Sequence, residues 1–329
     1  MNDSLSIGKI RGLLQIAGST GIFTMTAMDH RGSLEYGLCP AESSECYEEM
    51  VEFKMELCAA LAPVSSAVLL DPIYGAAQAI ARGAVPKGTG LLVSVEATGY
   101  KGDRTARVTS VLEGWGVEKI KRMGASAVKM LVYFRPDSGK LAVTQLNTVE
   151  NVALQCIKHD IPFLVEPVAY PMGGETAADF ALKKTSLVVE TARMMTALPI
   201  DVLKAEFPAD AANVSDDETL REACHALDNA STKPWVILSA GADFNVFRRE
   251  VDLACRAGAS GFLAGRAIWQ EAVSMAQKTD RVQFLDSVAT RRLKEIRLIA
   301  EICARPWYQK LGLAPDRLGV ADEGWHSRY

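Results

Sequence analysis

Eight short apolar runs, separated by longer stretches of helical periodicity, most constrain the fold of this 329-residue chain. The runs are rich in leucine and β-branched residues and do not alternate with polar ones, which is typical of parallel strands covered on both faces. Eight such strand–helix repeats predict an α/β fold, the (β/α)₈ or TIM barrel. The runs lie at residues 22–27, 67–70, 91–95, 127–132, 163–165, 201–208, 235–238 and 261–264.

A doubly wound open sheet is the alternative architecture, but no GxGxxG follows the first run, which weakens a dinucleotide-binding interpretation. We expect one more charged helix from about residue 280 through Cys303, and then a loosely structured tail. One domain over 1–329 is expected, with a barrel core at about 20–280 and a C-terminal helix and tail at 281–329. The remaining helices are predicted at 40–61, 115–123, 148–159, 179–196, 215–228 and 247–257.

Composition excludes several classes of function. The net charge is −4, so no basic surface for nucleic acid is expected. No apolar run approaches the ~18–20 residues of a membrane helix, and the N-terminus lacks the pattern of a signal peptide. The seven cysteines are scattered without CxxC spacing, so we expect reduced thiols and a cytoplasmic protein. We expect no metal or other cofactor.

Ionisable and polar residues occur where most of the predicted strands end. Barrel enzymes carry their chemistry at the carboxyl ends of the strands, whereas stability alone would tolerate apolar or small residues there. This clustering predicts an active site at one end of the barrel. The residues are Asp29, Asp71, Glu96, Lys129, Glu166, Lys204, Glu206, Ser239 and Arg266.

Lys204 lies within an apolar run and is the candidate nucleophile. Strand alternation places Lys204 and Glu206 on one face. Burial lowers the pKa of a lysine, and the free amine that results can attack a carbonyl and form a Schiff base. The alternative is a lysine that simply pairs with Glu206.

Lys129 and Glu166 are the candidate partners of this nucleophile. Two lysines in one barrel mouth repel each other, which favours loss of a proton from one of them. Alternatively, Lys129 pairs with an acid of a neighbouring strand. Glu166 could relay protons if burial raises its pKa, or could form a salt bridge with a lysine, and these two roles can coexist.

Two further groups of residues are candidate substrate ligands. Ser239, Gly241, Gly265 and Arg266 fit the phosphate site common after the last two strands of such barrels, although similar loops also occur as simple turns. The second group follows the first strand. There, Asp29 could orient a lysine or a substrate hydroxyl, Arg31 could bind an anion or an acid, and His30 could be an acid–base group or a structural histidine.

With these residues in place, the chain resembles the class I tagatose-1,6-bisphosphate aldolases and the related sulfofructosephosphate aldolases. The resemblance extends from Met25 to about Trp307. Segments 69–75 and 96–100 look more like the first group, and the strands of Trp235 and Phe262 more like the second. The most specific segments are 164–167, 201–206, 234–241 and 257–267.

The resemblance implies a (β/α)₈ barrel with a Schiff-base lysine at Lys204, a supporting lysine at Lys129 and an acid–base carboxylate at Glu166. It also implies an anion site at Ser239, Gly241, Gly265 and Arg266, and a homo-oligomer. His30 departs from the pattern, since both groups usually have glutamine there.

We therefore expect a metal-independent aldolase that cleaves a ketose 1,6-bisphosphate, tagatose 1,6-bisphosphate in the first place, to dihydroxyacetone phosphate and glyceraldehyde 3-phosphate. The alternatives are a sulfofructosephosphate aldolase that yields sulfolactaldehyde, a phosphosugar isomerase without a covalent imine, and a non-catalytic sugar-phosphate sensor. The expected catalytic residues are Lys204, Glu166, Lys129 and Asp29, and the expected substrate ligands are His30, Arg31, Asp71, Glu206, Ser239, Gly241, Gly265 and Arg266.

Overall fold

A computed structural model describes residues 5–39, 46–319, 321–327 and 329. Eight parallel strands close into a barrel in sequence order, which confirms the predicted (β/α)₈ architecture and excludes the open sheet. The strands are β1 Phe23–Ala27, β2 Ala67–Leu70, β3 Gly90–Ser94, β4 Ala127–Tyr133, β5 Phe163–Val168, β6 Val202–Ala205, β7 Trp235–Leu238 and β8 Gly261–Ala264.

The predicted helices are present, and most of their first and last residues agree with the prediction within a few residues. The helix predicted at 148–159 begins eight residues earlier, at Lys140, and the first residues of the one predicted at 40–61 lie outside the described part of the chain. The helices are α1 Ile7–Ala17, α2 Gly32–Leu38, α3 Cys46–Leu61, α4 Ala76–Ala81, α5 Val117–Arg122, α6 Lys140–Lys158, α7 Ala177–Thr196, α8 Asp217–Ala230, α9 Phe244–Arg256, α10 Arg266–Trp269, α11 Lys278–Phe284, α12 Thr290–Cys303 and α13 Trp307–Lys310.

Two apolar cores lie on the two sides of the strands. The outer core fills the space between the strands and the surrounding helices. Because side chains alternate along a strand, the residue two positions after an inward apolar residue also points inward. This parity places Glu166 above Leu164 and Lys204 above Val202. Strand residues of the inner core include Phe23, Met25, Ala27, Ala67, Leu69, Leu92, Ala127, Leu164, Val202, Val236 and Leu263.

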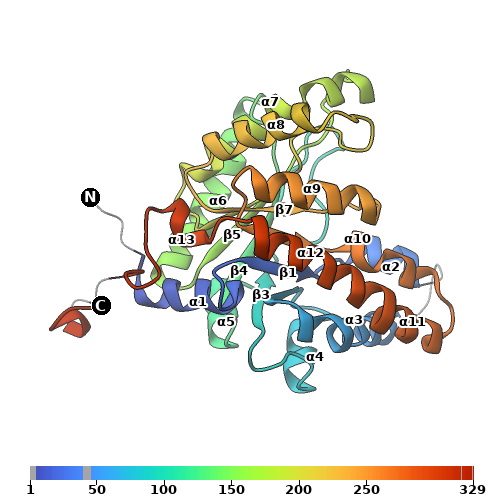
Figure 1. Ribbon diagram of the computed structural model, residues 1–329, viewed down its shortest axis with the longest axis horizontal. Helices are drawn as coiled ribbons and strands as arrows, with labels where there is room; N and C mark the ends of the chain where they lie inside the picture. Colours follow the sequence, from blue (N-terminus) through green and yellow to red (C-terminus); the bar gives the residue numbers. More distant parts are fainter. Residues whose placement is uncertain (1–4, 40–45, 320, 328) are drawn as a thin grey trace.

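The amino end of the barrel is closed by two segments that are far apart in the sequence. Figure 1 shows α1 and α13 at one end of the barrel, while α2 and α10 lie towards the other. Leu13 and Ile16 of α1 and Trp307 of α13 belong to the inner core. Helix α1 lies so close to the strands that a Cβ atom on Gly90 would stand 2.6 Å from the carbonyl oxygen of Gln15. The carboxyl end therefore remains open for a site.

The C-terminal segment packs along the barrel. The long helix predicted after residue 280 is present, but a π-helical turn, η3 (Leu285–Ala289), separates α11 from α12. The tail predicted as loosely structured begins with α13, whose Trp307 is fully buried against the barrel. Within the part of the chain that the structure describes, no helix is both long and apolar enough to cross a membrane.

Two cysteines correct the prediction that all thiols are reduced. Cys39 at the end of α2 and Cys46 at the start of α3 form a disulfide, with their Cα atoms 5.6 Å apart. Their seven-residue spacing matches no familiar motif, so only the meeting of the two helix ends reveals the pair. The other five cysteines are free, and burial raises the pKa of Cys58 to about 12.

Candidate active site

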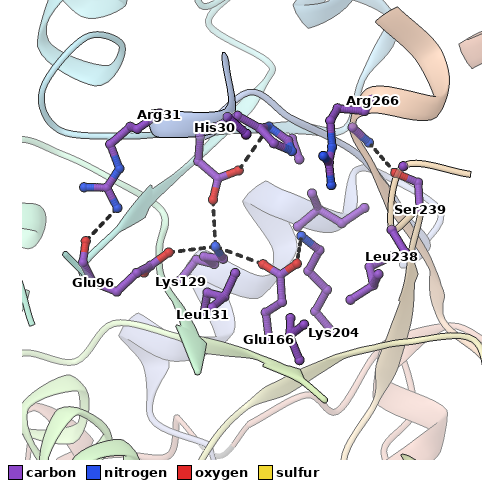
Figure 2. Close-up of a pocket in the computed structure, with 18 of the residues that line it drawn as sticks. His30, Arg31, Glu96, Lys129, Leu131, Glu166, Lys204, Leu238, Ser239 and Arg266 are labelled. Carbon is purple, nitrogen blue, oxygen red and sulfur yellow. Dashed lines mark hydrogen bonds and ion pairs between the residues drawn. The ribbon is translucent and has the colours of Figure 1, made fainter. Parts of the chain in front are cut away.

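A cavity of about 560 Å³ opens at the carboxyl end of the barrel, and Figure 2 shows a close-up of it. The structure brings all but one of the predicted site residues to its wall, the exception being Asp71. Those that line the cavity are Asp29, His30, Arg31, Lys129, Glu166, Lys204, Glu206, Ser239, Gly241, Gly265 and Arg266.

Lys129 lies at the centre of three carboxylates. Its Nζ atom is 2.7 Å from Asp29, 2.8 Å from Glu96 and 2.9 Å from Glu166. Burial alone would lower the pKa of Lys129, but the three acids outweigh it and hold the pKa well above its usual value. Lys129 is therefore a fixed positive charge, which supports the alternative of ion pairing over proton loss from this lysine.

Glu166 bridges the two lysines. Its Oε1 atom is 2.7 Å from Nζ of Lys204, and its Oε2 atom is 2.9 Å from Nζ of Lys129. Burial raises the pKa of this carboxyl, but Lys129 and Lys204 outweigh that effect and lower it overall. The salt bridge to a lysine, one of the two roles considered for Glu166, is therefore present, whereas the condition of a raised pKa is not met because the two cations outweigh burial. The acid that pairs with Lys204 is Glu166 and not Glu206.

His30 is a neutral side chain at the cavity wall. Its Nδ1 atom is buried, lies 3.9 Å from Oδ1 of Asp29 and has no hydrogen-bond partner, while its ring packs edge-on against Trp269. Burial lowers the pKa of His30 to about 3, against the opposing effect of Asp29. Burial alone would raise the pKa of Asp29, but Lys129 and other cations outweigh burial and lower this pKa overall. The pair is therefore a carboxylate beside an uncharged imidazole.

Arg31 and Glu96 form the side of the cavity next to β3. The Nη2 atom of Arg31 donates a hydrogen bond of 2.7 Å to the backbone carbonyl of Glu96, while its Nη1 atom is buried without a partner. The Oε1 atom of Glu96 accepts a hydrogen bond from Lys129. The sequence predicts Glu96 at a strand end but indicates no specific role for it. Its position two residues after the inward Ser94 was the available signal.

The residues predicted to bind an anion lie together at the ends of β7 and β8, in a group that we call the cradle (Ser239, Gly241, Gly265 and Arg266). The backbone N–H of Gly265 donates to Oγ of Ser239 at 3.3 Å. Gly241 has φ +79°, and a Cβ atom there would stand 3.4 Å from the guanidinium carbon of Arg266. Arg266 thus lies over a glycine that leaves room for it, and its Nε atom has no partner. A hydroxyl, backbone amides and a guanidinium that converge in this way suit a phosphate.

Glu206 lies on the cavity wall, as strand alternation predicts, whereas Asp71 does not. Glu206 lines the cavity and accepts a hydrogen bond from the backbone N–H of Ala169, and burial raises its pKa. Asp71 is fully buried in an ion pair with Lys54, so the prediction that it binds substrate is wrong. Lys54 also donates to the carbonyl of His30, and Asp71 therefore supports the loop of the site from below.

Tyr133, Leu131 and Leu238 also line the cavity and were not predicted, because apolar and aromatic strand residues carry no signal that separates a cavity wall from the core.

Among the residues that the structure describes, no group of three His, Cys, Asp or Glu side chains could hold a metal ion. Figure 2 shows the ammonium group of Lys129 between Glu96 and Glu166. The same ammonium group also contacts Asp29.

Comparison with known proteins identifies the family of this chain. A family model described as DeoC/LacD family aldolase matches residues 23–271. The tagatose 1,6-diphosphate aldolase 2 of Streptococcus mutans is 29% identical over 329 residues, which cover 94% of this chain and 99% of that protein. The tagatose 1,6-diphosphate aldolase of Lactococcus lactis is 30% identical over 324 residues, 92% of this chain and 98% of that protein.

Solved aldolase structures share the fold. An archaeal fructose-1,6-bisphosphate aldolase, determined with its catalytic lysine covalently bound to the carbinolamine intermediate, has a TM-score of 0.54 at 19% identity, over 86% of this chain and 98% of that one. The fructose-bisphosphate aldolase of Plasmodium falciparum has a TM-score of 0.64 at 12% identity, over 89% and 94%.

Proposed function

Because the chain belongs to the DeoC/LacD family of aldolases, we propose that it is a class I aldolase that uses Lys204 to cleave a ketose 1,6-bisphosphate. The proposed substrate is tagatose 1,6-bisphosphate, and the products are dihydroxyacetone phosphate and glyceraldehyde 3-phosphate. The observation that carries the proposal is Glu166, which contacts the nucleophile Lys204 on one side and the fixed charge of Lys129 on the other.

Glu166 is ionised near neutral pH because its pKa is lowered, so it can take a proton from Lys204. The free amine then attacks the C2 carbonyl and forms a carbinolamine. Protonated Glu166 returns the proton to the carbinolamine hydroxyl, which leaves as water and gives a protonated imine. Lys129 and Asp29 keep their charges throughout and hold Glu166 in place.

The imine then acts as an electron sink. Glu166 takes the proton of the C4 hydroxyl, the C3–C4 bond breaks, and its electron pair passes into the imine to form an enamine while the aldehyde leaves. Glu166 gives the proton to C3, and water hydrolyses the resulting imine to release dihydroxyacetone phosphate. One carboxylate within reach of both reacting ends can perform these transfers in turn.

The two ends of the substrate are proposed to lie on opposite sides of the lysines. Figure 2 shows Arg266 and Ser239 beyond Lys204, and Arg31 and Glu96 beyond Lys129. The phosphate at C1 is assigned to the cradle of Ser239, Gly241, Gly265 and Arg266. Arg31, with its unpaired Nη1 atom, faces the distal half of the sugar. Anchoring both ends holds C2 at Lys204, a proximity effect that contributes several kcal/mol (~7–11 at most).

A side-by-side cleavage assay tests the substrate. We expect kcat/KM for tagatose 1,6-bisphosphate to exceed that for sulfofructose 1-phosphate at least tenfold, since Arg31 attracts a doubly charged phosphate at the distal end more strongly than a singly charged sulfonate. Dihydroxyacetone phosphate is the product from both and gives a common readout. Faster release from the sulfosugar would reassign the enzyme to that reaction. Turnover of neither sugar would contradict the proposal.

A further inference from the structure

Arg107 packs among three tyrosine rings in the connection that follows β3. Its guanidinium carbon lies 4.8 Å from the ring centroid of Tyr100, 5.2 Å from that of Tyr133 and 5.2 Å from that of Tyr170. Within the described residues, no Asp or Glu forms an ion pair with it. The Tyr133 ring is itself part of the cavity wall. The Arg107 side chain therefore lies against a residue of the cavity wall, at the end of β4.

Other arginines that stack on aromatic rings in this structure are neutralised. Arg135 lies over Phe180 and pairs with Asp137 and Glu175. Arg281 lies over Phe53 and pairs with Glu56, and Arg292 lies over Phe284 and pairs with Glu271.

Arg107 makes more ring contacts than any of these and yet has no carboxylate among the described residues. Stacking uses the faces of a guanidinium and leaves its in-plane N–H donors free. Nε donates a hydrogen bond to the carbonyl of Arg104, and no other residue in the described part of the chain accepts one from this side chain. Nη1 and Nη2 can therefore serve an anion in a bidentate manner.

The segment that carries Arg107 is held in place. It belongs to a hairpin in the β3–α5 connection, in which Glu96 pairs with Val111 and Lys101 pairs with Val108. Thr109 accepts a hydrogen bond from the backbone N–H of Tyr133, which ties the hairpin to β4. A ligand at Arg107 would therefore meet a preformed group with little ordering to be done.

The position of the hairpin identifies the kind of ligand. In a closed barrel of eight strands in sequence order, β3 and β4 lie across from β7 and β8, which carry the cradle of Ser239 and Arg266. We infer that Arg107 binds the anionic group at the distal end of the substrate, a phosphate at C6. This inference rests on the proposed function for the placement of the first phosphate. Arg31 contacts Glu96 and Arg107 contacts Tyr100, the two residues that flank the cavity-lining segment 97–99 in the sequence.

Mannitol 1,6-bisphosphate and mannitol 1-phosphate test this by calorimetry. Mannitol is two-fold symmetric, so the two probes differ only by one equivalent phosphate, and neither has a carbonyl that could form an imine. The wild-type protein should bind the bisphosphate at least tenfold more tightly. Arg107→Gln should weaken bisphosphate binding about 10- to 100-fold and change monophosphate binding less than twofold, because one charged hydrogen-bonded pair is lost.

Arg104→Gln is the matched control, since Arg104 is an exposed arginine on the same hairpin whose backbone carbonyl is kept. It should change neither affinity more than twofold. Arg107→Lys keeps the charge and the stem that packs on the rings but lacks the planar fork, so it should lose about three- to tenfold on the bisphosphate alone. This variant decides the matter if Arg107→Gln does not fold.

If Arg107→Gln loses affinity equally for both probes, Arg107 has a structural role and the inference is overturned. Unchanged bisphosphate affinity in both Arg107 variants would also overturn it. So would equal affinity of the wild-type protein for the two probes. The outcome is separate from that of the aldolase proposal. A failure to trap an imine on Lys204 would overturn the chemistry while a selective loss at Arg107 still held.

Discussion

The Oε1 atom of Glu166 lies 2.7 Å from the Nζ atom of Lys204 in a nearly solvent-free setting. An amide at this position keeps the shape of the side chain but cannot take up and return a proton. Glu166→Gln should therefore lower kcat for ketose bisphosphate cleavage about 10²- to 10⁴-fold with a much smaller change in KM. Steady-state kinetics with purified enzyme measure both.

Glu206→Gln is the comparison for this variant. Glu206 is a partly buried acid on the cavity wall, two residues from Lys204, but it bonds to the backbone of Ala169. The decrease in kcat should be at least tenfold smaller in Glu206→Gln than in Glu166→Gln. If Glu166→Gln retains activity within tenfold of wild type, Glu166 is not the proton relay.

Lys129→Met should destabilise the fold more at neutral pH than in acid. Removing the buried cation leaves Asp29, Glu96 and Glu166 without their common partner, which should cost about 3–5 kcal/mol of unfolding free energy near pH 7. Urea unfolding of both proteins measures this difference.

The pH dependence has a definite sign. In the wild type, the pKa values of Asp29 and Glu166 are lowered from 3.8 and 4.5, so the stability they contribute is present above those values and is lost as the pH falls through the folded-state pKa values. In Lys129→Met these acids can protonate in the folded state at higher pH. The difference in stability should therefore narrow from pH 7 to pH 4, and a difference that widens would contradict the ion-pair assignment.

His30→Gln should make the protein less sensitive to mild acid. The folded-state pKa of His30 is about 3 against 6.5 when unfolded, so below pH 6.5 the unfolded chain takes up a proton that the folded chain does not. The wild type should lose about 2 kcal/mol from this source between pH 7 and pH 5. Urea titrations of both proteins at pH 7 and pH 5 should show that the variant lacks this acid-dependent loss of stability. Equal acid losses would mean that His30 is protonated in the folded protein.

Thiol titration tests the disulfide between Cys39 and Cys46. The chain has seven cysteines, and five of them are free. Denatured protein should therefore react with five equivalents of a thiol reagent before reduction and with seven after it. Closing so short a loop should stabilise the fold by about 2–3 kcal/mol, measurable as a lower urea midpoint of Cys39→Ser. Seven equivalents without reduction would show that the pair does not form.

The barrel was predictable because continuous apolar runs of strand length have few other solutions. Leu69 and Leu92 occupy the barrel interior, and Val93 faces the outer core, as buried parallel strands require. Strand parity also anticipated that Lys204 shares the cavity with Glu206. Helix starts were less predictable, since α6 begins after Gly139, where no side chain caps the helix.

The partners within the site could not be read from the sequence in the same way. Strand ends reveal which charges meet at one end of the barrel but not which acid reaches which lysine. Lys204 pairs across strands with Glu166, and Asp71 turns away to Lys54. The pKa of Glu166 depends on two cations from β4 and β6, so its direction follows only from their distances. The neutral state of His30 could not be predicted from the sequence either, because it results from burial to which Trp269 and Gly265 contribute.

Borohydride reduction in the presence of dihydroxyacetone phosphate tests the central claim most directly. Reduction converts the imine into a stable secondary amine, and peptide mass spectrometry then locates it. The account predicts a single adduct on Lys204 and none in Lys204→Met. An adduct on Lys129, or none on any lysine of a protein shown to bind the ligand, would contradict it.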